Sequence, residues 1–389
     1  MERFEDKVSF GGKDLNILDE QKKKEGFEIM KTPEIVVRDE RGAQLFSLIL
    51  KAEDPNWGDT KNPLAKETVA YFKDNPLTPE IKSGIQELRE NGVDEESLYN
   101  FALAYKNPER LGVIFEMAAK HKPHIKTPQE VQQKFFDILQ SFDQTFSSSS
   151  LSEKLQLAAE QDKDKRLGNM EETRKRMSAL IDFFKPDPKT TKTTRVNFMP
   201  TNPLYKKNSG RNFSLGTEQI ILSHVDNIVN QDHEFLHGVV NPVVDKLFEK
   251  LTDKQQEKIL GLASGKLKLG YKYPYSILCE ELINTFNDVF RKGEKPETYD
   301  DFKEKISSIS EEAFQEEFSR NKILKATCDE LGIASLEDLK NKSQEYFEWF
   351  EKNQLRGLVL EFYQEYSTLS NTKEINFERF VLEKFPDKL

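Results

Sequence analysis

The stretch His-Glu-Phe-Leu-His at residues 233–237 carries the side chains in this sequence that are best suited to chemistry. Four residues advance an α-helix by slightly more than one turn, so His233 and His237 project from the same face. Two neutral imidazoles at that spacing can bind one Zn²⁺ ion. Glu234 lies one position round the helix, where it can take a proton from a water that zinc has made acidic. The pattern predicts a zinc site with Glu234 as general base.

A catalytic zinc needs a third protein ligand and a fourth position that stays open. Gly238 and the residues after it exclude a third histidine at the close H-E-x-x-H-x-x-G-x-x-H spacing. Residues 276–290, SILCEELINTFNDVF, indicate a second helix that carries two adjacent glutamates. Glu280 is the preferred third ligand because apolar residues frame a buried face beside it. Glu281, one position further round the helix, is the alternative.

Other side chains near the second helix could support the site. Asn284, one turn after Glu280, could hydrogen-bond a zinc-bound imidazole. Tyr271, Tyr273 and Tyr275 come just before this helix, and a phenol near zinc could donate a hydrogen bond to a developing oxyanion. Packing within the loop is the more ordinary role of such tyrosines.

The elements that must position these residues are mostly helices. The apolar pattern predicts a helix over 34–54 and a long charged helix from about 151 to 184, which ends where two prolines follow. Residues 193–200 and 218–224 indicate two strands, and the turn-rich segment 201–216 between them is expected to be a loop. The sequence therefore predicts a predominantly helical α+β protein, with a small sheet beside the helix of the histidine pair.

These patterns divide the chain into four regions. Residues 1–33 are expected to be a loosely ordered lead-in, and residues 34–190 a helical N-terminal region. Residues 191–295 are the expected catalytic core, and residues 296–389 a C-terminal helical region. Lys206, Lys207 and Arg211 lie in the expected loop, where they could bias the choice of substrate or simply be solvated.

The composition excludes several classes of protein. The net charge is −10 with no dense basic face, so nucleic acid is a poor candidate partner. Two cysteines cannot form a disulfide framework. No run of about 18 apolar residues indicates a membrane span. The N-terminus is charged and lacks an apolar signal segment, so we expect a cytoplasmic protein, or a secreted or periplasmic one whose signal was removed.

The segment HEFLHGVVNPVVDKLF resembles a family of uncharacterised bacterial metallopeptidases, known as a domain of unknown function, in which H-E-F-x-H precedes V-N-P. Less specific similarities, such as FFDILQSF, RVNFMPTNPL and CEELIN, extend over roughly residues 34–389. The resemblance implies a zincin-like core of the gluzincin type. It also implies that His233, His237 and Glu280 bind zinc and that Glu234 is the general base.

The expected function is zinc-dependent hydrolysis of peptide bonds in a peptide or protein substrate, with one Zn²⁺ ion as cofactor. Two alternatives remain at this point. The protein could bind the metal without turnover, or it could be a helical interaction protein in which the histidine pair has no role.

Overall fold

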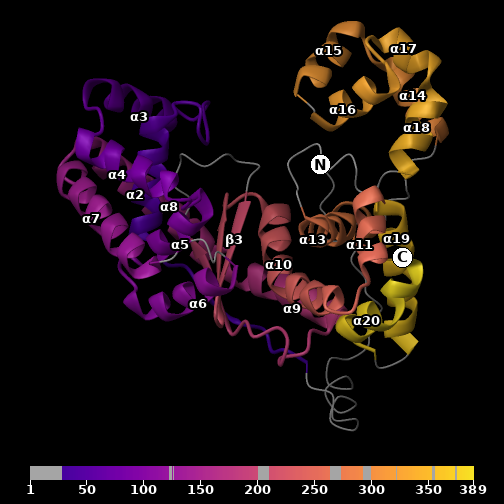
Figure 1. Cartoon of the computed structure of the whole chain (residues 1–389), viewed down its shortest axis with the longest axis horizontal. Helices are drawn as coiled ribbons and strands as arrows, with labels where there is room; N and C mark the ends of the chain where they lie inside the picture. The colour runs from indigo at the N-terminus through magenta and orange to yellow at the C-terminus, as the bar shows by residue number, and fades with distance from the viewer. Residues whose placement is uncertain are drawn as a thin grey trace.

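The computed structural model describes residues 29–121, 125, 127–199, 210–262, 273–291, 299–320, 322–352, 355–372 and 375–389. Within these residues the protein is predominantly helical and has a four-stranded sheet (Figure 1). The predicted α+β class is confirmed. The expected lead-in, residues 1–33, lies almost entirely outside the described residues.

The sheet consists of three parallel strands and one antiparallel strand at its edge. Its strands are β1 (Glu34–Val36), β2 (Arg195–Met199), β3 (Gly210–Leu215) and β4 (Glu218–Ser223), in the spatial order β1-β2-β4-β3. The strands β2 and β4 confirm the two predicted strands. A two-residue turn joins β3 to β4, and Gly216 in this turn has a positive φ of 65°, which glycine adopts without strain.

The sequence patterns did not indicate β1 and β3. Residues 34–36 were expected to begin a helix, but they form a strand that pairs with β2, far away in the sequence. Residues 210–215 were expected to belong to a loop. In β3, Phe213 and Leu215 are buried and Ser214 between them is exposed, so the strand alternation is present but hidden among turn-forming neighbours.

The first group of helices covers one face of the sheet. It comprises α2 (Arg41–Glu53), α3 (Pro63–Asp74), α4 (Pro79–Glu90), α5 (Glu95–Ala104), η2 (Pro108–Arg110), α6 (Leu111–His121), α7 (Pro128–Phe146) and part of α8 (Ser150–Gly168). Phe46 of α2 lies edge-on to Tyr99 of α5, with ring centroids 4.9 Å apart. Tyr99 in turn contacts Phe213 of β3, so these helices pack directly on the edge strand.

The long helix expected over 151–184 is interrupted at Asn169 and forms α8 and α9 (Met170–Phe184). Gly168 and Asn169 are both weak helix formers, which explains a break at this point. The helix α9 ends where Lys185 adopts a left-handed conformation before Pro186. The predicted stop at the prolines is therefore confirmed.

The second group of helices packs on the opposite face of the sheet. It comprises α9, α10 (Ile228–Phe248), α11 (Asp253–Leu262), α13 (Pro274–Thr285), the π-helical turn η3 (Phe286–Phe290), α19 (Arg356–Thr372) and α20 (Phe377–Lys388). Val196, Phe198 and Ile221 of the sheet point into this group. The sheet thus separates two apolar cores.

The remaining helices form a third apolar cluster that stands apart from the sheet (Figure 1). They are α14 (Tyr299–Ser308), α15 (Glu311–Arg320), α16 (Lys322–Leu331), α17 (Leu336–Asn341) and α18 (Ser343–Lys352). The apolar contacts therefore group α9, α19 and α20 with the helices of the expected catalytic core. Within the expected region 296–389, α19 and α20 belong to the second apolar core, whereas α14–α18 form the third cluster.

No helix among the described residues is long and apolar enough to cross a membrane. Cys279 and Cys328 are buried free thiols, as a chain without a disulfide framework would have.

A buried ion pair joins the first group of helices to the sheet. Glu40, which precedes α2, accepts hydrogen bonds from Nη1 and Nη2 of Arg110 at 2.7 and 2.9 Å. Asn197 of β2 donates to the same carboxylate at 2.7 Å, and Arg110 also donates to Glu218 of β4 at 2.9 Å. The side chains of Glu40 and Arg110 are 1% and 4% exposed. The pair is therefore a buried structural link.

We expect the substitution Glu40→Gln to lower the free energy of unfolding by on the order of 3 kcal/mol, because Arg110 would stay charged and buried with Glu218 as its one remaining carboxylate partner among these residues. Urea unfolding measures the change. The control is Glu34→Gln, which removes a carboxylate from the exposed pair with Arg195 and should cost under about 1 kcal/mol. Equal costs for the two variants would contradict this assignment.

Candidate metal centre

The helix α10 carries the histidine pair and begins with a side-chain cap. The side chain of Asn227 accepts a hydrogen bond from the backbone N–H of Asn230 at 3.0 Å. Phe235, Leu236 and Val240 are fully buried and anchor the helix in the second core. Because this apolar face is fixed, the opposite face of α10 must present the two histidines together.

A glutamine of the neighbouring strand holds the backbone of α10 at the histidine pair. The side-chain amide of Gln219 in β4 donates to the carbonyl oxygens of Glu234 at 2.7 Å and Phe235 at 3.2 Å. A Cβ atom on Gly238 would lie 2.7 Å from Oε1 of Gln219. The glycine therefore lets α10 lie directly on the strand. Sequence reasoning missed Gln219, whose one signal is its position as a polar residue in an apolar strand.

The edge strand β3 passes close to Glu234. A Cβ atom on Gly210 would lie 2.4 Å from Oε1 of Glu234, closer than any side chain allows. Glycine at the start of β3 therefore makes room for the carboxylate. Sequence reasoning did not single out Gly210, because it had placed this segment in a loop.

The structure brings His233, His237 and Glu280 together. The two Nε2 atoms lie 3.2 Å apart. The carboxylate of Glu280, on α13, places one oxygen 3.5 Å from Nε2 of His233 and the other 3.5 Å from Nε2 of His237. In the part of the chain that the structure describes, these residues form a group that could hold a metal ion.

The two adjacent glutamates of α13 have different surroundings. Glu280 is partly exposed and faces the imidazoles. Glu281 is 3% exposed, accepts a hydrogen bond from the hydroxyl of Thr285 at 3.3 Å and is not a member of the metal-binding group. The geometry favours Glu280, the preferred ligand in the sequence analysis, over Glu281.

The amide that supports an imidazole is Asn241. Its Oδ1 lies 3.1 Å from Nδ1 of His237, one turn along α10. An acceptor at Nδ1 keeps the proton on that nitrogen and leaves Nε2 free to bind a metal. Asn284 was expected in this role, but it makes no hydrogen bond to an imidazole among the described residues. His237 is therefore supported by a residue of its own helix, whereas a residue of the second helix had been expected.

The three candidate tyrosines differ in position. Tyr271 lies outside the described residues. Tyr273 precedes α13 and is 67% exposed. Tyr275 is partly buried, and its hydroxyl donates to the backbone carbonyl of Asn241 at 3.4 Å. Burial raises the pKa of Tyr275, so it stays protonated as a donor. Its contact supports the turn that contains Asn241.

Glu234 is close to the metal-binding group but is not one of its members. Burial raises the pKa of Glu234 to about 8, and the negative charge of Glu280 adds to the increase. Arg211 of β3 acts in the opposite direction. Its guanidinium donates to Glu95 at 2.6 Å and lies 4.8 Å from the centre of the Tyr99 ring. Of the three basic residues expected in the loop, Lys206 and Lys207 lie outside the described residues.

Comparisons with models of protein families, with curated proteins and with solved structures gave no match. The resemblance seen in the sequence around residues 233–248 therefore remains an expectation. The geometry of the site is the basis for a functional proposal.

The contact at Gly238 reverses an ordinary helix preference. In an exposed helix, replacing glycine with alanine stabilises a protein by about 0.5–1 kcal/mol. We expect Gly238→Ala instead to lower the free energy of unfolding by about 1 kcal/mol or more, because the new methyl group would displace Gln219. Gly112→Ala in α6 is the control, since a Cβ atom there meets nothing within 4 Å. Urea unfolding that showed the same gain for both variants would contradict the close contact.

The raised pKa of Glu234 predicts how metal-free protein responds to pH. The folded state holds this proton up to a pKa of about 8, whereas the ordinary value is 4.5. Between these values the folded state binds more protons than the unfolded state, so stability falls as pH rises. With a chelator present, the free energy of unfolding should decrease less from pH 5 to 8 in Glu234→Gln than in wild type. Equal decreases would show that Glu234 does not carry this proton.

Proposed function

We propose that the protein is a zinc-dependent metallopeptidase with a zincin-like core. The spacing of the three ligand atoms carries the proposal. Ligands held tetrahedrally about 2.0–2.1 Å from one zinc ion lie about 3.3 Å from one another. The separations of 3.2, 3.5 and 3.5 Å among His233, His237 and Glu280 match this value. Two imidazoles and one carboxylate leave the fourth position for water or substrate, as in catalytic zinc sites.

The donor set also discriminates among metals. Calcium and magnesium prefer six or more oxygen ligands, whereas imidazole nitrogen suits zinc and its neighbours in the first transition series. Asn241 favours the tautomer of His237 that binds through Nε2. The residues present therefore fit zinc.

When bound there, zinc would polarise the scissile carbonyl and lower the pKa of a water molecule to about 7. The protein must then move one proton, and we assign this step to Glu234. Its carboxylate lies beside the metal-binding group, and Gly210 leaves it space under β3. Glu234 would accept the proton from the attacking water and deliver it to the leaving amine. Such a group typically contributes about 10²–10⁴-fold to the rate.

The edge strand suggests how a peptide would bind. Among the described strands, β3 is antiparallel at one edge of the sheet and begins beside Glu234. An extended peptide could add to this edge through backbone hydrogen bonds, which would direct a peptide bond toward the metal. A peptide substrate is therefore more consistent with the site than a nucleic acid, as the acidic net charge also indicates.

Metal content and turnover together test the proposal. We expect one equivalent of zinc in wild type and in Glu234→Gln, and its loss in His233→Ala and Glu280→Ala. Glu281→Gln is the matched control on the same helix and should retain zinc. Wild type should cleave a mixed peptide library, and Glu234→Gln should be slower by about 10²-fold or more.

Two outcomes would contradict the proposal. Zinc bound equally by wild type and Glu280→Ala would show that the ligand set is wrong. Zinc bound as expected, with no cleavage of the library by wild type, would favour a metal-binding module without turnover.

A further inference from the structure

A buried carboxylate stands directly before the first histidine of the metal-binding group. The side chain of Asp232 is 1% exposed. One of its oxygens accepts a hydrogen bond from Nε of Arg176 at 3.3 Å, and the other accepts from Nη1 of Arg291. A buried carboxylate with two guanidinium partners makes charge-assisted bonds that are costly to break.

The two arginines come from different elements. Arg176 lies on α9, and Arg291 directly follows η3, which continues the helix α13 that carries Glu280. Asp232 is on α10 with both histidines. Asp232 therefore links the helix of the two histidines to the continuation of the helix that supplies the third ligand.

A second contact joins the same two helices on the other side of the metal-binding group. There the hydroxyl of Tyr275, in the first turn of α13, donates to the backbone of Asn241 on α10. Along α13 Glu280 lies between Tyr275 and Arg291, and along α10 the histidines lie between Asp232 and Asn241. The three ligands thus lie between two contacts that join α10 to α13.

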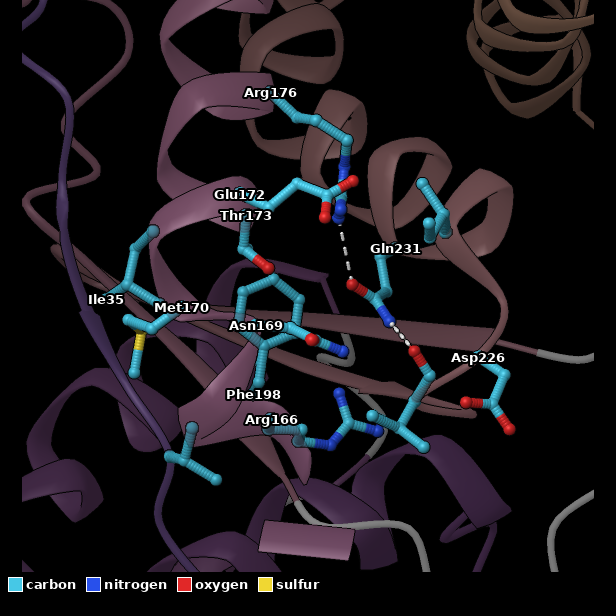
Figure 2. Close-up of a pocket in the computed structure, with 13 residues that line it drawn as sticks. Ile35, Arg166, Asn169, Met170, Glu172, Thr173, Arg176, Phe198, Asp226 and Gln231 are labelled. Atoms are coloured by element: carbon cyan, nitrogen blue, oxygen red, sulfur yellow. Dashed lines mark hydrogen bonds between the residues drawn. The ribbon is translucent and has the colours of Figure 1, made fainter. Parts of the chain in front are cut away.

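Arg176 of α9 also binds Gln231, the residue before Asp232. Figure 2 shows Arg176 reaching across to Gln231, and Nη2 of Arg176 donates to Oε1 of Gln231 at 3.0 Å. The amide of Gln231 donates to the backbone carbonyl of Val225 at 2.8 Å, between β4 and α10. The first turns of α10 are therefore tied both to α9 and to the end of the sheet.

We infer that Asp232 is a positioning residue of the metal centre. Through Arg291 it fixes the helix of Glu280 relative to the helix of His233 and His237, and so it sets the affinity for zinc. The inference rests on the proposed zinc site but assigns a role to residues that do not touch the metal. Residues that orient metal ligands typically change metal affinity about 10–100-fold when they are replaced.

The test measures zinc affinity by competition with a chelator in folded wild type, Asp232→Asn and Glu40→Gln. Glu40 provides the control because it is an equally buried carboxylate that pairs with an arginine in the first group of helices. We expect Asp232→Asn to weaken zinc binding about 10-fold or more. Glu40→Gln should lower stability but leave the affinity within about 3-fold of wild type. The visible spectrum of bound Co²⁺ should change in Asp232→Asn and not in Glu40→Gln.

Arg291→Gln covers the case in which Asp232→Asn does not fold. The side chain of Arg291 is 34% exposed, so its replacement should be tolerated. Zinc should bind more weakly to Arg291→Gln as well, with Arg89→Gln, from an exposed pair with Glu53, as the control. Wild-type affinity and an unchanged Co²⁺ spectrum in Arg291→Gln would overturn the inference while leaving the proposed function intact. Absence of zinc binding by wild type would overturn both.

Discussion

The packing of α10 between the sheet and α13 is the constraint on which the site depends. On one side, Gln219 bonds to two carbonyl groups of α10, and Gly238 makes that approach possible. On the other side, α13 brings Glu280 within 3.5 Å of both imidazoles. Both contacts depend on the position of α10. The second apolar core, which includes α9, α19 and α20, holds both helices in place.

Three glutamates in this region show how surroundings divide one residue type into different roles. Glu280 is partly exposed and faces two imidazoles. Glu281 is buried against Thr285, in a structural position. Glu234 is buried under the edge strand, where desolvation raises its pKa to about 8. That value belongs to the metal-free protein, and the positive charge of a bound zinc ion would lower the pKa and favour the carboxylate form that a general base needs. The position of Glu234 beside the ligands is consistent with that role.

The local patterns of the sequence were sufficient for the histidine pair, the preference for Glu280, and the class of fold. The first two rest on helical periodicity and the third also on two short strand-like segments, and both kinds of pattern are recorded locally in the sequence. The contacts of Gln219 and Gly210 could not be anticipated in the same way. Gln219 and Gly210 act across elements whose pairing depends on the whole fold, and β3 had not been recognised as a strand. Asn241 contacts His237 at the i, i+4 spacing of a single helix, a local signal that the sequence reasoning overlooked in favour of Asn284 on the second helix.

The most direct test of this account is zinc K-edge X-ray absorption on the purified, zinc-loaded protein. We expect one four-coordinate zinc with two imidazole ligands and further oxygen ligands, at distances of about 2.0–2.2 Å. Substitution of Glu280 by Gln should alter the oxygen shell and leave the imidazole scattering in place. A spectrum with sulfur ligands, six oxygen ligands or no imidazole scattering would contradict the assignment of His233, His237 and Glu280 as the metal site.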